Sequence, residues 1–140
     1  MPGMIGIDWG TSSFRAFRLG ADGVVRERRQ APRGILSVTD GAFATVVHEL
    51  TGDWLRDGED RILLSGMIGS RQGWRESKAL PCPAGIDDLA GALAPVPFDA
   101  APAFIVPGLS AQDRQGTPEL MRGEETQIAG VLASIGANGL

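Results

Sequence analysis

The chain has 140 residues, 43% of them hydrophobic and 21% charged, with a formal net charge of −4 at pH 7. That length makes one domain at most, and the composition excludes a disordered chain. No run of eighteen apolar residues offers a membrane span, no basic segment precedes the first apolar run, and the negative charge argues against nucleic-acid binding. The one cysteine, Cys82, has no partner for an internal disulfide, which fits a reducing cytoplasm.

The first thirty residues predict a three-stranded antiparallel meander. Met4 to Trp9 is a short apolar run, and Ser13 to Leu19 alternates with period two. The turn 20–23 (GADG) then leads into a third strand at 24–30 (VVRERRQ). The charges of Arg26 to Arg29 alternate along this strand, which predicts a solvated face.

From Thr39 onward the pattern predicts helices that alternate with buried strands. Apolar residues recur at helical spacing from Phe43 to Trp54, and Arg61 to Ser65 is an almost wholly apolar strand. The further expected elements are a helix at 86–93, a strand at 103–106 and a helix at 124–135. The order βββαβαβα predicts an α/β fold, a mixed sheet with flanking helices and right-handed crossovers. Ribonuclease-H-like domains, each of which is half of an actin or hexokinase fold, have this order.

The segment 8–13 (DWGTSS) is a candidate phosphate cradle between the first two strands. Asp8 ends a strand and can hold a magnesium ion through water. Gly10 lets backbone N–H groups approach an anion, and the hydroxyls of Thr11, Ser12 and Ser13 donate further hydrogen bonds. The alternative is a plain β-turn.

The segment 65–74 (SGMIGSRQGW) is a candidate substrate loop. It follows a buried strand, at the carboxyl end where open α/β sheets place their ligands. Arg71 is a natural fork for a carboxylate and Gln72 a partner for sugar hydroxyls, whereas the alternative is a surface loop with an incidental arginine. The predicted substrate-binding residues are Ser65, Gly66, Met67, Ser70, Arg71, Gln72, Gly73 and Trp74.

Two acidic residues open the last predicted helix, in the segment 122–127 (RGEETQ). We expect Glu124, or in second place Glu125, to be the general base for a sugar hydroxyl. Complementing the helix dipole is the alternative role. His48 is expected at the surface or at the boundary of the core on its helix, and Cys82 is expected to be a packed loop thiol.

Together these blocks resemble the N-terminal half of the 2-dehydro-3-deoxygalactonokinase family, which belongs to the hexokinase/actin-like superfamily. The matching stretches run in order from Ile5 to Gly130: IGIDWGTSSFRAFRL, LSGMIGSRQGW, PCPAG, IVPGLS and MRGEETQIAG. SGMIGSRQGW and MRGEETQ are far more specific than DWGTSS, which many sugar kinases and actin-like ATPases share.

The resemblance implies transfer of the ATP γ-phosphate to the 6-hydroxyl of 2-dehydro-3-deoxy-D-galactonate, with Mg²⁺, in the cytoplasm. It implies that Asp8 holds magnesium and that residues 10–13 meet the γ-phosphate. Family chains are longer, so residues 1–140 are expected to be an N-terminal ribonuclease-H-like domain. A second kinase domain or a homo-oligomer partner would then supply the other side of the active-site cleft. A non-catalytic sugar-acid-binding module and an actin-like ATPase remain alternatives, and no nucleic-acid or membrane partner is expected.

Overall fold

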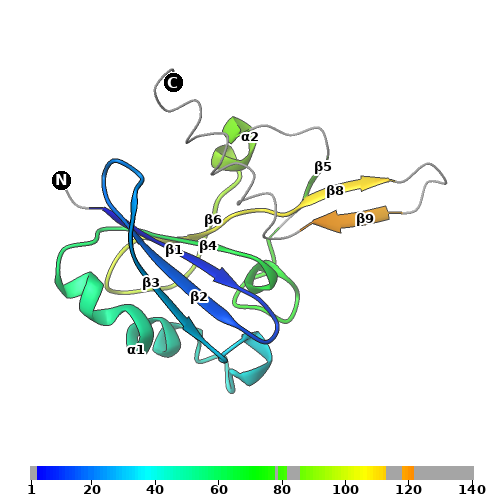
Figure 1. Cartoon of the computed structure of the whole chain (residues 1–140). Helices are drawn as coiled ribbons and strands as arrows, with labels where there is room; N and C mark the ends of the chain where they lie inside the picture. Colours follow the sequence, from blue (N-terminus) through cyan, green and yellow to red (C-terminus); the bar gives the residue numbers. More distant parts are fainter. Residues whose placement is uncertain (1–2, 78, 82–85, 113–117, 122–140) are drawn as a thin grey trace.

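A mixed β-sheet with a helix against one face forms the body of the protein (Figure 1). The computed structural model describes residues 3–77, 79–81, 86–112 and 118–121. In this part of the chain the main sheet has six strands in the order β3-β2-β1-β4-β7-β6. Its strands are β1 (Met4–Trp9), β2 (Phe14–Leu19), β3 (Val25–Ala31), β4 (Ile62–Ser65), β6 (Ala94–Pro95) and β7 (Ala103–Ile105).

The predicted meander is confirmed. β1 pairs antiparallel with β2, and β2 pairs antiparallel with β3. The chain reverses at Gly20–Gly23, where the Gly23 N–H donates to the Gly20 carbonyl at 2.9 Å and Gly23 has a φ of 81°. Such a left-handed backbone angle favours glycine, so the turn is encoded locally.

The second half of the sheet is parallel. β1 pairs with β4, and β4 pairs with β7. A parallel partner cannot be reached by a hairpin, so the chain first builds β2, β3 and the helix α1 (Phe43–Arg56) before it returns as β4. This pairing brings the carboxyl ends of β1 and β4 to the same edge of the sheet.

Helix α1 covers one face of the sheet and closes the core. Along β1, Ile5, Ile7 and Trp9 are buried while the residues between them are half-buried, as period two requires. The helix buries a matching apolar stripe that includes Val47 and Trp54. Other fully buried members of this core are Phe14, Ile62, Leu64, Ile68 and Ile105.

The sequence predicts one of the smaller elements. The helix expected at 86–93 is confirmed as α2 (Ile86–Gly91), and β6, which was not predicted, follows it. A second sheet pairs β5 (Leu80–Pro81), β8 (Leu109–Gln112) and β9 (Pro118–Met121). The strands β5 and β6 have two residues each, too few for a periodic pattern. The helix predicted at 124–135 lies outside the described residues.

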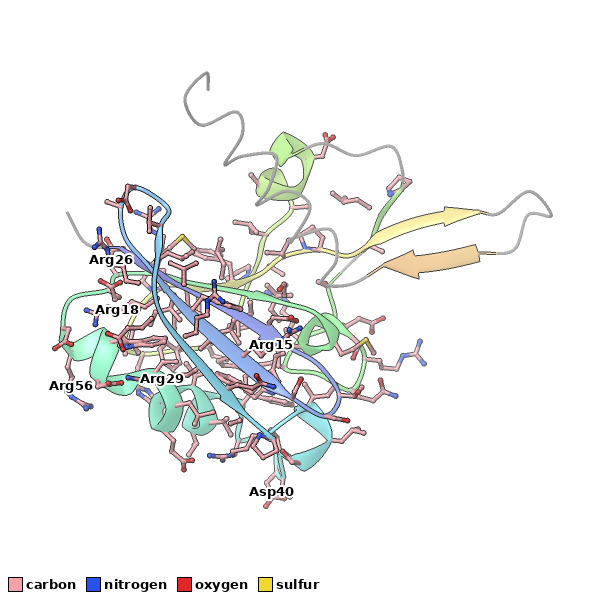
Figure 2. All side chains as sticks on the ribbon, viewed as in Figure 1. Arg15, Arg18, Arg26, Arg29, Asp40 and Arg56 are labelled. Atoms are coloured by element: carbon pink, nitrogen blue, oxygen red, sulfur yellow. The ribbon has the colours of Figure 1, made fainter. Side chains whose placement is uncertain are left out.

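Arg29 of β3 departs from the predicted solvated face. The side chains of Arg26 and Arg28 are exposed, but Arg29 turns toward α1 (Figure 2). Its guanidinium makes two hydrogen bonds to the Asp53 carboxylate, of 2.6 and 2.5 Å, and its Cζ lies 4.1 Å from the ring centre of Trp54. The hydrogen bonds from Arg29 hold the pKa of Asp53 well below its ordinary value. Arg29 therefore joins the outer strand to the helix.

We expect Asp53→Asn to lower the free energy of unfolding at pH 7 by about 0.5–1 kcal/mol, because the pair is half-exposed. The folded pKa of Asp53 is lowered, so its contribution is complete above the unfolded carboxyl pKa of about 4 and is lost as the pH falls further. Urea unfolding between pH 7 and pH 2 measures the difference. Asp40→Asn, in an exposed turn, is the matched control and should show no such dependence.

Candidate active site

The candidate phosphate cradle and the candidate substrate loop meet at one edge of the sheet. The register of β1 against β4 sets Asp8 beside Ser65. Gly66 follows, and a Cβ on it would lie 3.2 Å from Oδ1 of Asp8 and 2.8 Å from the Trp9 carbonyl oxygen. Two motifs that are far apart in the sequence are therefore in direct contact.

The turn at 10–13 is tight and fixed by its backbone. The Gly10 N–H donates to the Ser13 carbonyl at 2.9 Å, so this amide is used inside the turn. The carbonyls of Gly10 and Thr11 accept hydrogen bonds from Ile35 and Leu36. Thr11 and Ser12 are exposed, whereas Gly10 and Ser13 are half-buried. The turn thus presents two hydroxyl side chains on a rigid backbone.

Asp8 has a partner that the sequence analysis missed, Arg15 on β2. Nη2 of Arg15 lies 2.5 Å from Oδ2 of Asp8, and the two residues face each other across the β1–β2 pair. The Asp8 side chain is 20% exposed and that of Arg15 45%, so solvent reaches both. Alternation with period two puts Asp8 and Arg15 each on the less buried face of its own strand. Only the register of the hairpin sets the two residues opposite each other.

The loop after β4 folds compactly on itself. Gly66 has a φ of 96°, and the short 3₁₀ helix η2 (Met67–Gly69) follows it. The Trp74 N–H donates to the Ile68 carbonyl at 3.0 Å, and Ile68 is completely buried. Gly73 lies so close to Ile68 that a Cβ on it would be 2.0 Å from the Ile68 carbonyl oxygen. The loop is therefore anchored to the core at its centre.

The predicted substrate-binding residues divide into three groups. Ser65 and Ser70 are buried, and Met67 is half-buried. The Ser65 hydroxyl donates to the Ile7 carbonyl, and the Ser70 hydroxyl donates to the Met67 carbonyl. Gln72 and Arg71 are exposed; the Arg71 side chain is 87% exposed, with its Nε 4.0 Å from a Glu76 oxygen. Gly66, as described above, contacts Asp8, and Gly73 and Trp74 are half-buried.

Trp74 belongs to an aromatic cluster that joins the loop to α1. Its ring stacks on Phe43 at 6.2 Å between centroids and meets Phe98 edge to face at 6.3 Å. His48 stacks on Phe98 at 4.5 Å, and its Nε2 lies 2.8 Å from Oδ1 of Asp99. This hydrogen bond holds the pKa of Asp99 below its ordinary value. The predicted surface position of His48 is confirmed.

The candidate bases, Glu124 and Glu125, lie outside the described residues, as does Cys82. Within the described ranges no group of three or more His, Cys, Asp or Glu side chains is assembled to hold a metal ion. No helix of that same part is long and apolar enough to cross a membrane.

A surface hollow of about 490 Å³ lies at the other end of the sheet, where Met4 pairs with Leu19. Arg18 lies within 4 Å of three carboxylates there, those of Glu27, Asp57 and Glu59. Figure 2 shows Arg18 and Arg26 at this end and Arg15 away from them. The hollow is lined by Gly3, Arg18, Gly20, Ala21, Asp22, Arg26, Glu27 and Glu59. The lining includes no residue of the segments 8–13 and 65–74, so the hollow is separate from the candidate site.

Known proteins resemble this chain over almost its whole length. The family model of 2-keto-3-deoxy-galactonokinase matches residues 8–139, almost the whole chain. The chain belongs to this family. A curated relative from Rhizobium meliloti (strain 1021), named "Probable 2-dehydro-3-deoxygalactonokinase DgoK1", is 37% identical over 131 residues, which cover 94% of this chain. The 2-dehydro-3-deoxygalactonokinase of Escherichia coli (strain K12) is 33% identical over 129 residues, or 92% of this chain.

A solved structure has the same fold over this length. It is titled "Crystal structure of a putative 2-dehydro-3-deoxygalactonokinase protein from Sinorhizobium meliloti", with a TM-score of 0.78 and 35% identity. The match covers 93% of this chain and 43% of that one. The chain likewise spans 42% of the length of each of the two curated relatives.

We expect Gly66→Ala to destabilise the fold by about 1–3 kcal/mol, since it combines a left-handed φ with a close approach to Trp9. Gly52→Ala is the comparison, because Gly52 lies in α1 and its Cβ would meet only the flexible end of Arg56. That variant should be neutral or slightly stabilising. Urea unfolding gives both values, and equal effects of the two substitutions would contradict the strain assigned to Gly66.

Proposed function

We propose that this chain is the N-terminal domain of a kinase that transfers the γ-phosphate of ATP to the 6-hydroxyl of 2-dehydro-3-deoxy-D-galactonate. The observation that carries the proposal is the contact between Asp8 and the Gly66 loop, which joins a phosphate turn to a substrate loop. Family membership and the names of the two curated relatives support the substrate class.

The ribonuclease-H-like fold is part of the same proposal. The element order βββαβαβα predicts three antiparallel strands followed by parallel ones. The sheet has this pattern over β3-β2-β1-β4-β7. In open α/β sheets, ligands bind beyond the carboxyl ends of the strands, where the strand order reverses. β1 is such a strand, since the chain first adds β2 and β3 on one side of it and later adds β4 and β7 on the other.

The residues present suit a magnesium–phosphate group. Magnesium prefers oxygen ligands, and this end of β1 offers the half-buried Asp8 carboxylate and the exposed residues Thr11 and Ser12, whose hydroxyls would add to it. When bound, Mg²⁺ would neutralise the charge of the phosphates. Arg15 lies on Asp8 and would be the cation that turns to a phosphate oxygen when the carboxylate takes a metal.

The Gly66 loop would hold the sugar acid. Arg71 is exposed and loosely paired, so its guanidinium is available for the carboxylate of the substrate. Glu124, or Glu125, would accept the proton of the 6-hydroxyl while that oxygen bonds to the γ-phosphorus and the bond to the β,γ-bridging oxygen breaks. ADP is the leaving group. Adenosine recognition and exclusion of water would need a facing domain.

The function is tested by adding the part of a relative that this chain does not span. The chain is mixed with the C-terminal part of the E. coli relative, and release of ADP is followed with and without the sugar acid. We expect ADP release that depends on the sugar acid in the mixture and little from the chain alone, because the reactants are then not held in line. Asp8→Asn should lower the rate of sugar-acid-dependent ADP release by about 10²-fold or more. Release of ADP without sugar acid would favour an actin-like ATPase, and binding of the acid without turnover a non-catalytic module.

In that mixture, Arg71→Ala should raise the KM for the sugar acid by about 10-fold or more and leave the KM for ATP nearly unchanged. Losing a charge-assisted pair to a carboxylate weakens binding of the acid by about 2 kcal/mol. Arg75→Ala is the control, because Arg75 is also exposed but donates to the Pro95 carbonyl. A selective rise in the KM for ATP would instead assign Arg71 to the nucleotide.

A further inference from the structure

A second loop, residues 33–36, lies against the candidate phosphate turn and is hydrogen-bonded to its backbone. The Ile35 N–H donates to the Gly10 carbonyl at 2.9 Å, and the Leu36 N–H donates to the Thr11 carbonyl at 3.3 Å. On the strand side, the indole N–H of Trp9 donates to the Arg33 carbonyl at 2.9 Å. Three hydrogen bonds therefore join two loops that β2 and β3 separate in the sequence.

Gly34 is the point of closest approach between these loops. A Cβ on Gly34 would lie 2.1 Å from the Thr11 carbonyl oxygen and 2.4 Å from the Ser12 nitrogen. Its φ is −68°, an angle open to every residue, so glycine is required here by space and not by backbone conformation. The atoms in the way are backbone atoms, which cannot rotate aside as a long side chain can. A methyl group at position 34 must displace the Thr11–Ser12 peptide.

The supporting loop is itself fixed to the core and to α1. Ile35 is 3% exposed and belongs to the main core cluster. Nη1 of Arg33 lies 2.5 Å from Oε2 of Glu49 on α1. The turn therefore rests on a loop held from two directions, and it cannot move without disturbing one of them.

We propose that Gly34 is a positioning residue for phosphate binding, which rests on the proposed function of the turn at 10–13. By admitting the Thr11–Ser12 peptide at contact distance, Gly34 sets where the two hydroxyl residues lie relative to Asp8. A misplacement of about 1 Å at a distance from the chemistry can lower a rate by about 10²-fold. Nothing in the sequence marks this role, since Gly34 lies in a loop with no phosphate motif of its own.

The test measures the turn and its ligand separately, in the ¹⁵N-labelled chain. Hydrogen exchange of the Ile35 and Leu36 amides reports the support, and Mg·ATP titration followed at the Thr11 and Ser12 amides reports binding. We expect Gly34→Ala to speed the exchange of both amides at least 10-fold and to weaken Mg·ATP at least 10-fold. Exchange of the Val47 amide in α1 shows whether the fold is retained.

Gly6→Ala is the matched control, because Gly6 lies in β1 and its Cβ would meet only a side-chain carbon of Leu19 at 3.9 Å. It should leave both readouts at wild-type values. Glu49→Gln is the second variant, since it loosens the loop through an exposed side chain without touching the core, and it should weaken Mg·ATP two- to threefold.

Wild-type affinity for Mg·ATP in a folded Gly34→Ala chain would overturn the positioning role and leave the proposed function intact. If Gly34→Ala does not fold, unchanged affinity in Glu49→Gln would overturn it. The absence of any Mg·ATP effect on Thr11 and Ser12 in the wild-type chain would instead overturn the proposed function of the turn, and with it the positioning role.

Discussion

The parallel pairing of β1 with β4 is the constraint on which the candidate site depends. A hairpin alone would place Asp8 next to Arg15 and nothing else. The parallel partner adds Ser65 and Gly66 on the other side of the same strand. This pairing requires a long connection, and the burial of α1 against the sheet is what stabilises it. The chemistry at the edge therefore depends on packing in the core.

An aromatic series carries this packing to the site. Trp9, the last residue of β1, meets Phe14 edge to face at 4.9 Å and Phe43 of α1 at 5.6 Å. Phe43 stacks on Trp74 of the candidate substrate loop. Such rings bury large areas with defined geometry, so β1, α1 and the loop after β4 share one set of contacts.

The sequence predicts the elements that have a period and misses those fixed by contact. Met4–Trp9 and Phe43–Arg56 are long enough to show alternation or helical spacing, and the structure has both. The short strands β5 and β6 have two residues each and depend on their partners. The sequence predicts Arg29 on a solvated strand face, whereas in the structure its guanidinium lies over the ring of Trp54.

The candidate site shows the same division. The segments 8–13 and 65–74 stand out because glycine, hydroxyl and acidic residues follow apolar strands, and the structure brings Asp8 and Gly66 together. The pairing of Arg15 with Asp8 requires the register of the hairpin, which no single residue reveals. The space that Gly34 leaves for Thr11 is visible only when both loops are folded. Contacts between distant loops are tertiary, and local patterns do not encode them.

The central claim is that the turn at 10–13 and the loop after β4 form one site, so that a metal-bound nucleotide held at the turn lies close to both segments. Paramagnetic broadening by Mn²⁺·ATP in the ¹⁵N-labelled chain tests it most directly, because broadening falls steeply with distance from the metal. The account predicts that amides of residues 10–13 and of residues 65–69 broaden together, while those of the Gly20–Gly23 turn at the opposite end of the sheet stay sharp. Broadening centred on the hollow around Arg18 and Glu59, or confined to one of the two loops, would contradict it.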